Sequence, residues 1–141
     1  MTKRSIVRLI DANANRAMEG IRVCEEIARF HVASPMAFQR TRRLRHAIAR
    51  AVRDLPLTAT DLARARESQR DIGRRAPASR VDSLERLLLM NFQRAKEALR
   101  TLEECSRLIA PSHTAVFQRL RFRTYEAERD LLLIVAALRH R

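Results

Sequence analysis

The sequence predicts an all-α protein, a four-helix bundle made of two tandem helical hairpins with pseudo-twofold symmetry. The composition supports the helical class, because the 141 residues include only two glycines and four prolines. An internal repeat supports the two hairpins, because residues 13–30 recur as residues 91–108. The length suits one hydrophobic core, so we expect a single helical domain over residues 1–141.

The repeat keeps polar residues more faithfully than apolar ones. Its identical positions are mostly charged: Asn13/Asn91, Arg16/Arg94, Ala17/Ala95, Glu19/Glu97, Arg22/Arg100, Glu25/Glu103, Glu26/Glu104 and Arg29/Arg107. A repeat that served only packing would instead keep its apolar positions. The shared polar residues are therefore candidates for a functional site.

Periodicity and capping signals define the first hairpin. Apolar residues recur every three or four positions over residues 5–31, which predicts the first long helix. Ser34 and Pro35 suit the N-cap and first helical positions, so a second helix begins there and stops before Pro56. The first repeat unit therefore covers about residues 5–55.

The second hairpin is predicted over about residues 82–139. Residues 82–85, DSLE, have the form of a capping box and open the helix that carries the second copy. Pro111 and Ser112 separate this helix from a fourth one. Arg123 projects onto the middle of the fourth helix's apolar face, where a buried guanidinium would need carboxylate or phosphate partners.

The connection over residues 56–80 has poor periodicity, apart from a short helix predicted near residues 60–65. Long connections in compact domains tend to be functional or disordered. This one brings together an arginine, a hydroxyl, a carboxylate and a glycine, which could bind phosphate and metal: Arg66, Ser68, Asp71 and Gly73. The alternative is a solvated, charged loop without a ligand.

The formal net charge of +13 favours an anionic partner. Nearly all of the positive charge is arginine, which grips phosphate with two parallel hydrogen bonds. Most arginines have an acidic residue three or four positions away and no long basic run exists, which disfavours a dedicated nucleic-acid binder.

Other sequence features bear on location and on the cysteines. No segment holds the ~20 uncharged apolar residues of a membrane span, and the N-terminus lacks the apolar core of a signal peptide. We therefore expect a soluble, cytoplasmic protein with no membrane partner. Cys24 and Cys105 fall on apolar helix faces, which predicts buried free thiols.

The two copies of the repeat are expected to meet in one cleft. A polar seam of Asn13, Arg16, Glu19 and Glu26 is repeated by Asn91, Arg94, Glu97 and Glu104. The seams converge if the symmetry axis passes between the two helices. Alternatively, each set forms ion pairs along its own helix, worth a few tenths of a kcal/mol per pair.

Four motifs, in order along nearly the whole chain, resemble a known family. They are Ile10-Asp11-Ala12-Asn13 through Ala28-Arg29-Phe30, Leu44-Arg45-His46, Arg66-x-Ser68-x-x-Asp71-Ile72-Gly73, and Asn91-x-x-Arg94-Ala95-x-Glu97 through Glu103-Glu104. This pattern is similar to the helical domain fused ahead of the barrel in some bacterial thiamine-phosphate synthases, which also occurs as a free-standing chain. The family resembled is the single-function hydroxymethylpyrimidine phosphate kinases. Ser68 departs from it, because threonine is commoner there.

The resemblance implies an ATP-dependent kinase that phosphorylates hydroxymethylpyrimidine phosphate to the diphosphate in thiamine biosynthesis, with Mg²⁺. Phosphoryl transfer of this kind needs cations that hold two phosphates in line and carboxylates that place the metal. Under this hypothesis the catalytic residues are Arg16, Arg94 and Asp71. Substrate or nucleotide would be bound by Asn13, Glu19, Arg45, His46, Arg66, Ser68, Gly73, Asn91, Glu97 and Arg123. The metal ligands would be Glu19, Glu97 and Asp71.

Other functions compatible with the sequence remain open. The chain could be a non-catalytic helical partner that docks on thiamine-phosphate synthase and channels its substrate. It could instead be a basic nucleic-acid-binding bundle, and a chorismate-mutase-like helical enzyme is a weaker alternative. A homodimer is compatible with each of these readings.

Overall fold

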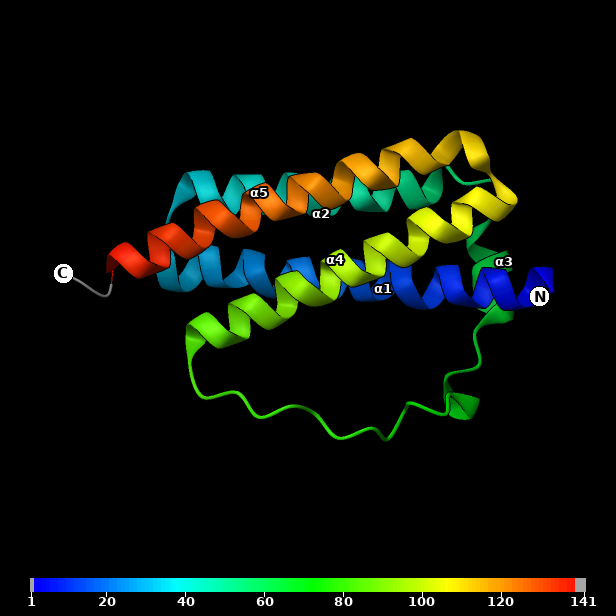
Figure 1. Cartoon of the computed structure of the whole chain (residues 1–141), viewed down its shortest axis with the longest axis horizontal. Coiled ribbons are helices and arrows are strands. Elements are labelled where there is room, and N and C mark those ends of the chain that lie inside the picture. The colour runs from blue at the N-terminus through cyan, green and yellow to red at the C-terminus, as the bar shows by residue number, and fades with distance from the viewer. Residues whose placement is uncertain (1, 139–141) are drawn as a thin grey trace.

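The computed structural model describes residues 2–138, which contain five α-helices and no β-strand (Figure 1). The helices are α1 (Lys3–Glu26), α2 (Pro35–Arg53), α3 (Ala59–Ala65), α4 (Leu84–Ile109) and α5 (Thr114–Leu138). A π-helical stretch (Ile27–Val32) continues α1, and single 3₁₀ turns occur at Ser68–Arg70 and Pro111–His113. The predicted all-helical class is confirmed. The pseudo-twofold axis stays a prediction, and residue 139 of the second repeat unit lies outside the described residues.

The four long helices each pack against two others. α1 packs against α2 and α4, and α5 packs against those same two helices. The short α3 lies against α1. Figure 1 shows that residues 66–83, here called the strap, run along the length of α1 and α4 before α4 begins. The strap therefore crosses one side of the helices instead of turning back tightly.

Hydroxyl side chains cap α1, α2, α3 and α4 at their N-termini. The Ser34 hydroxyl accepts a hydrogen bond from the Ala37 backbone N–H at 3.2 Å, which confirms the predicted start of α2. The predicted capping box before α4 was wrong by one residue: Ser83, rather than Asp82, is the N-cap. A complete capping box instead opens α3, where hydrogen bonds from Thr58 hold the pKa of Asp61 below its ordinary value.

The helices α1 and α4 lie close together at Gly20. A Cβ atom built on Gly20 would lie only 2.7 Å from the backbone oxygen of Asn91 and 3.4 Å from the Cβ of Ala95. A side chain at position 20 would therefore push the two helices apart. The absence of a side chain at Gly20 therefore allows α1 to pack directly against the backbone of α4.

The buried face of α5 differs from the predicted one. It consists of Phe117, Leu120, Thr124, Ala127, Leu131 and Val135. Arg123, expected on this face, is exposed. Thr124 lies on the buried face instead. Its hydroxyl donates a hydrogen bond to the backbone oxygen of Leu120 at 2.8 Å, so the polar group is not left without a partner in the core.

Both cysteines are free and buried, as predicted. Burial raises the pKa of Cys24, and the charge of Glu128 raises it further. Burial also raises the pKa of Cys105. None of the helices within residues 2–138 combines the length and apolar character that a membrane span needs. The cytoplasmic location stays a prediction.

Candidate functional site

Many of the repeated polar residues form ion pairs within their own helix. In α1, Arg22 contacts Glu25 at 3.0 Å and Glu26 at 3.1 Å. In α4, Arg100 contacts the matching residues Glu103 at 3.5 Å and Glu104 at 3.3 Å. These residues form the same lattice in both copies, which accounts for their identity without a ligand.

The first glutamate of each pair also joins the two helices of its hairpin. Glu25, with its side chain 2% exposed, accepts hydrogen bonds from Nε and Nη2 of Arg45 at 3.1 and 3.2 Å. The buried Glu103 accepts from Nη2 of Arg121 at 3.2 Å. Arg45, expected to bind a ligand, is therefore held by a buried carboxylate on the neighbouring helix.

The two repeated asparagines make the same hydrogen bond to their own helices. The side-chain amide of Asn13 donates to the Leu9 backbone oxygen, and that of Asn91 donates to the Leu87 backbone oxygen, both at 2.9 Å. Asn13 is buried, and its side-chain carbonyl has no donor among residues 2–138. That oxygen is free to accept from a ligand.

A cleft of about 730 Å³ lies between α1, the strap and α4. It brings together eight of the predicted site residues: Asn13, Arg16, Glu19, Arg66, Ser68, Asp71, Gly73 and Arg94. Six arginines line it, namely Arg8, Arg16, Arg66, Arg70, Arg74 and Arg94. Four carboxylates line it, namely Asp11, Glu19, Glu67 and Asp71. We call this the arginine cleft.

Two of those carboxylates are taken up by arginine. Asp11 accepts from Nε and Nη2 of Arg66 at 2.8 and 2.6 Å, and this carboxylate raises the pKa of the Arg66 guanidinium. Glu67 contacts Arg4 at 2.5 Å. Asp71 turns onto its own segment, where it accepts from the backbone N–H of Gly73 at 2.9 Å.

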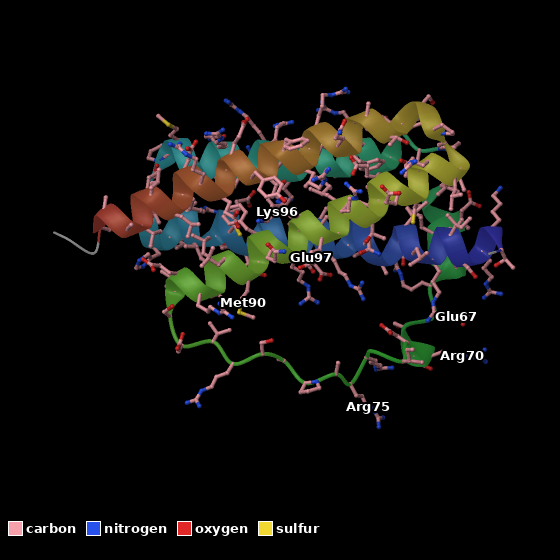
Figure 2. All side chains as sticks on the ribbon, in the orientation of Figure 1. Glu67, Arg70, Arg75, Met90, Lys96 and Glu97 are labelled. Atoms are coloured by element: carbon pink, nitrogen blue, oxygen red, sulfur yellow. The ribbon has the colours of Figure 1, made fainter. Side chains whose placement is uncertain are left out.

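The other cleft arginines are available to a ligand. Within residues 2–138, no ion pair joins Arg16, Arg70, Arg74 or Arg94 to a carboxylate. Arg16 and Arg94 come from two different helices, and Arg70 and Arg74 come from the strap. Figure 2 shows Glu67 and Arg70 at the end of the strap near α3, and Arg75 on its outer side, pointing away from the helices. Arginines on both sides of one cleft are suited to hold phosphate.

Several predicted residues lie outside the arginine cleft. Asn91 lies at the crossing of α1 and α4, and Glu97 is exposed and accepts from the Gln93 amide at 2.9 Å. His46 is exposed on α2. Arg123 lines a separate cavity of about 590 Å³ between α2 and α5. The two seams therefore converge only in part, because Arg94 alone of the second seam reaches the cleft.

The three proposed metal ligands do not meet. Glu19 and Asp71 line the arginine cleft, whereas Glu97 does not. Among the described residues, no three His, Cys, Asp or Glu side chains are grouped closely enough to hold a metal ion. The described side chains thus do not form a protein-built metal site, and the parts assigned to Mg²⁺ and ATP stay predictions.

Sequence reasoning missed part of this cleft, including Asp11, Arg70 and Arg74. A signal for Asp11 was present, because it lies four residues after Val7 and three before Ala14, both buried. That spacing places a carboxylate on the apolar face, where it needs a cationic partner. Arg70 and Arg74 gave no such signal, because only the course of the strap brings them to the cleft.

The fold and this cleft define the class: an all-helical protein with an arginine-rich cleft suited to a small phosphorylated ligand. The sequence model of the ThiD2 family matches residues 8–130. The chain belongs to the ThiD2 family.

Curated relatives of this chain are named thiamine-phosphate synthase. The relative from Synechocystis sp. is 38% identical over 132 residues, which is 91% of this chain and 36% of that protein. The relative from Nostoc sp. is 35% identical over 135 residues, 90% of this chain and 35% of that protein. The relative from Rhodopirellula baltica is 33% identical over 142 residues, 98% of this chain and 37% of that protein. The chain thus spans about a third of the length of these relatives. No solved structure matches it significantly.

These comparisons correct the function expected from the sequence. The prediction of an ATP-dependent hydroxymethylpyrimidine phosphate kinase was wrong, because these relatives carry the name thiamine-phosphate synthase and none of them is named a kinase. The expected resemblance to a part of thiamine-phosphate synthases is confirmed, because the chain matches about a third of the length of proteins with that name. Of the sequence-based alternatives, the helical partner of thiamine-phosphate synthase fits these findings best.

Proposed function

We propose that this chain is a non-catalytic helical partner of thiamine-phosphate synthase, which holds a phosphorylated pyrimidine in the arginine cleft and delivers it to the synthase. The observation that carries the proposal is the match of this chain, over about nine-tenths of its length, to a third of proteins named thiamine-phosphate synthase. Under this proposal the matched third of those proteins binds the substrate and the remainder carries the synthase centre.

The cleft supports the choice of ligand. Arg16 and Arg94 approach from two helices without carboxylate partners, so their planar guanidiniums can each direct two N–H groups at one phosphate. The free side-chain carbonyl of Asn13 supplies an acceptor for the edge of the pyrimidine ring. The cleft volume of about 730 Å³ is typical of sites for small organic ligands.

Calorimetric titration tests the binding step. Hydroxymethylpyrimidine phosphate is titrated into the purified chain, with unphosphorylated hydroxymethylpyrimidine as the comparison. We expect the phosphorylated compound to bind at least about tenfold more tightly, because a charge-assisted hydrogen bond is worth more than about 1.4 kcal/mol. Arg94→Ala should reduce that difference. Arg119→Ala is the matched control, because Arg119 is exposed on α5 and lies outside the cleft.

The delivery step needs the synthase. With limiting pyrimidine substrate, turnover by a separate thiamine-phosphate synthase should rise when the wild-type chain is added and should not rise with Arg94→Ala. Equal affinity for both pyrimidine compounds would contradict the ligand assignment. Tight binding of duplex DNA, weakening steeply with salt and insensitive to Arg94→Ala, would favour the nucleic-acid alternative.

A further inference from the structure

A buried carboxylate on α1 fixes the beginning of the strap. Asp11 is 5% exposed, and both of its carboxylate oxygens accept from Arg66, the first residue of the strap. The side-chain amide of Asn15 donates to the backbone oxygen of Asp11 at 3.0 Å and approaches its Oδ1 at 3.4 Å. The Asp11 side chain is therefore held in one orientation toward the strap.

The next residue of the strap is also held by α1. The backbone oxygen of Glu67 accepts from Nη2 of Arg8 at 3.0 Å, and its carboxylate contacts Arg4. Beyond Glu67, the strap is exposed, and its hydrogen bonds are made within the strap until Ser83 caps α4. We call these contacts of residues 66 and 67 with α1 the clamp. The position of Arg70 and Arg74 over the cleft thus depends on the clamp.

The second copy of the repeat shows that the helical scaffold itself does not require this carboxylate. Leu89 stands two residues before Asn91, where Asp11 stands two residues before Asn13, and Leu89 is 39% exposed. A buried carboxylate is costly without a cationic partner. The carboxylate is present in one copy only, and there it contacts the strap. This indicates that its role is to hold the strap.

We propose that Asp11 is a positioning residue, which holds Arg66 and thereby places Arg70 and Arg74 opposite Arg16 and Arg94, so that the phosphate is held from both sides. An arginine has five N–H donors, and Asp11 engages one on Nε and one on Nη2, which leaves Nη1 of Arg66 for the ligand. The ligand in this inference is taken from the proposed function. The clamp itself is seen directly in the contacts of residues 66 and 67 with α1.

Limited digestion with trypsin tests the clamp without any ligand. The strap carries cleavage sites after Arg66, Arg70, Arg74, Arg75 and Arg80, and the many arginines of the helices report global unfolding in the same digest. Asp11→Asn keeps the size of the side chain and removes its charge. We expect strap cleavage to accelerate by about tenfold or more, because the variant loses the charge-assisted hydrogen bonds that hold Arg66. The cleavage rate in the helices should be unchanged.

Glu97→Gln serves as the matched control, because Glu97 is an exposed carboxylate outside the cleft. Should Asp11→Asn destabilise the whole fold, Arg66→Gln opens the same clamp from its exposed side and should give the same strap-specific acceleration. Strap cleavage at the wild-type rate in Arg66→Gln would overturn the proposal.

A double-mutant cycle on the affinity for hydroxymethylpyrimidine phosphate tests the route through Arg66. Asp11→Asn and Arg66→Ala should each weaken binding by about tenfold, and the double variant should bind no worse than Arg66→Ala alone. If the two losses multiply, Asp11 does not act through Arg66 and the proposal fails.

The cycle also separates this inference from the proposed function. A wild-type chain that does not bind the phosphorylated pyrimidine overturns the proposed function, and the digestion result still decides whether Asp11 positions the strap. A wild-type chain that binds, with Asp11→Asn binding equally well, overturns the positioning role and leaves the proposed function standing.

Arg74→Ala and Arg75→Ala provide the last matched pair. The two residues are adjacent in the strap, and Arg74 lines the cleft whereas Arg75 does not. Arg74→Ala should weaken binding of hydroxymethylpyrimidine phosphate several-fold, and Arg75→Ala should leave it unchanged. Equal effects of the two variants would show that the strap acts only through its overall charge, against the placement proposed.

Discussion

The helix α1, which begins the first repeat unit, and the helix α4, which begins the second, make several matching contacts and differ at the surface where the strap lies. In each copy an asparagine bonds the backbone four residues earlier, and an arginine–glutamate lattice follows it. Only the first copy carries a buried aspartate that receives the strap. The comparison teaches that most identical residues of the duplicated helix serve its scaffold. Arg16 and Arg94 are identical too but line the arginine cleft, and that cleft lies on the side where only the first copy receives the strap.

A second difference lies between α4 and α5. Lys96 matches Met18 in the first copy, and its Nζ donates to Glu128 at 2.9 Å and lies 4.5 Å from the ring centre of Tyr125. The first copy has an apolar side chain at this position and the second has a partly buried ion pair. Polar variation of this kind helps to fix how two helices pair.

The largest expected effect tests whether Arg45 belongs to the helical scaffold or to the binding site. Arg45→Ala should lower the free energy of unfolding by about 3 kcal/mol, because it leaves the buried Glu25 carboxylate without its interhelical partner. Chemical denaturation measures this loss. Arg121→Ala should cost less, because Arg121 reaches Glu103 through Nη2 only and its Nε has no partner among the described residues. Arg42→Ala, an exposed control on α2, should change stability little. If Arg45→Ala loses ligand affinity without losing stability, Arg45 binds the ligand instead of serving the scaffold.

The next effect tests the close approach of the two copies. Gly20→Ala should destabilise the fold by about 1–3 kcal/mol, because its Cβ would overlap the Asn91 backbone oxygen and force α1 from α4. The loss would exceed the gain in helix propensity, which is about 1 kcal/mol. Thermal unfolding followed by circular dichroism measures it. Ala98 is the matching residue of α4, and Ala98→Gly should cost about 1 kcal/mol through propensity and lost packing. Unchanged or raised stability in Gly20→Ala would mean that the helices adjust freely at this crossing.

A smaller effect tests the one residue of the second copy that reaches the cleft. Arg94→Lys keeps the charge and loses the planar fork, so affinity for hydroxymethylpyrimidine phosphate should fall about fivefold to tenfold, or about 1 kcal/mol. Titration calorimetry measures the change, and stability should stay at the wild-type value because Arg94 is exposed. Undiminished affinity would argue that Arg94 contributes only net charge.

The smallest expected effect comes from making the copies more alike. Leu89→Asp gives α4 the residue that Asp11 provides in α1. Because Leu89 is partly exposed and receives no arginine from the strap, we expect a change in stability within about 0.5 kcal/mol and no change in ligand affinity. A gain in affinity on titration would show that a carboxylate at this position creates a site without the strap, contrary to the comparison above.

Local chemistry in the sequence determined the helical class and several of the positions at which helices begin. Ser34 and Pro35 marked the start of α2, and the apolar spacing of residues 5–31 marked the first helix, because capping and periodicity depend on near neighbours in the chain. Eight candidate residues in the arginine cleft were also foreseen, since an unusual set of polar residues was already visible as a repeat and a motif.

Only the tertiary structure decided which of these residues meet. Arg45 binds Glu25, Arg123 lies in solvent and Glu97 turns away from the cleft, although the sequence gives no reason to separate them from Arg16 or Arg94. The long strap brings Arg66 to Asp11 across 55 positions of the chain, a pairing that helical periodicity cannot encode. A charged side chain finds its partner through the packing of whole helices, so the sequence by itself determined the helices and the supply of polar groups, and the fold decided which groups form a site.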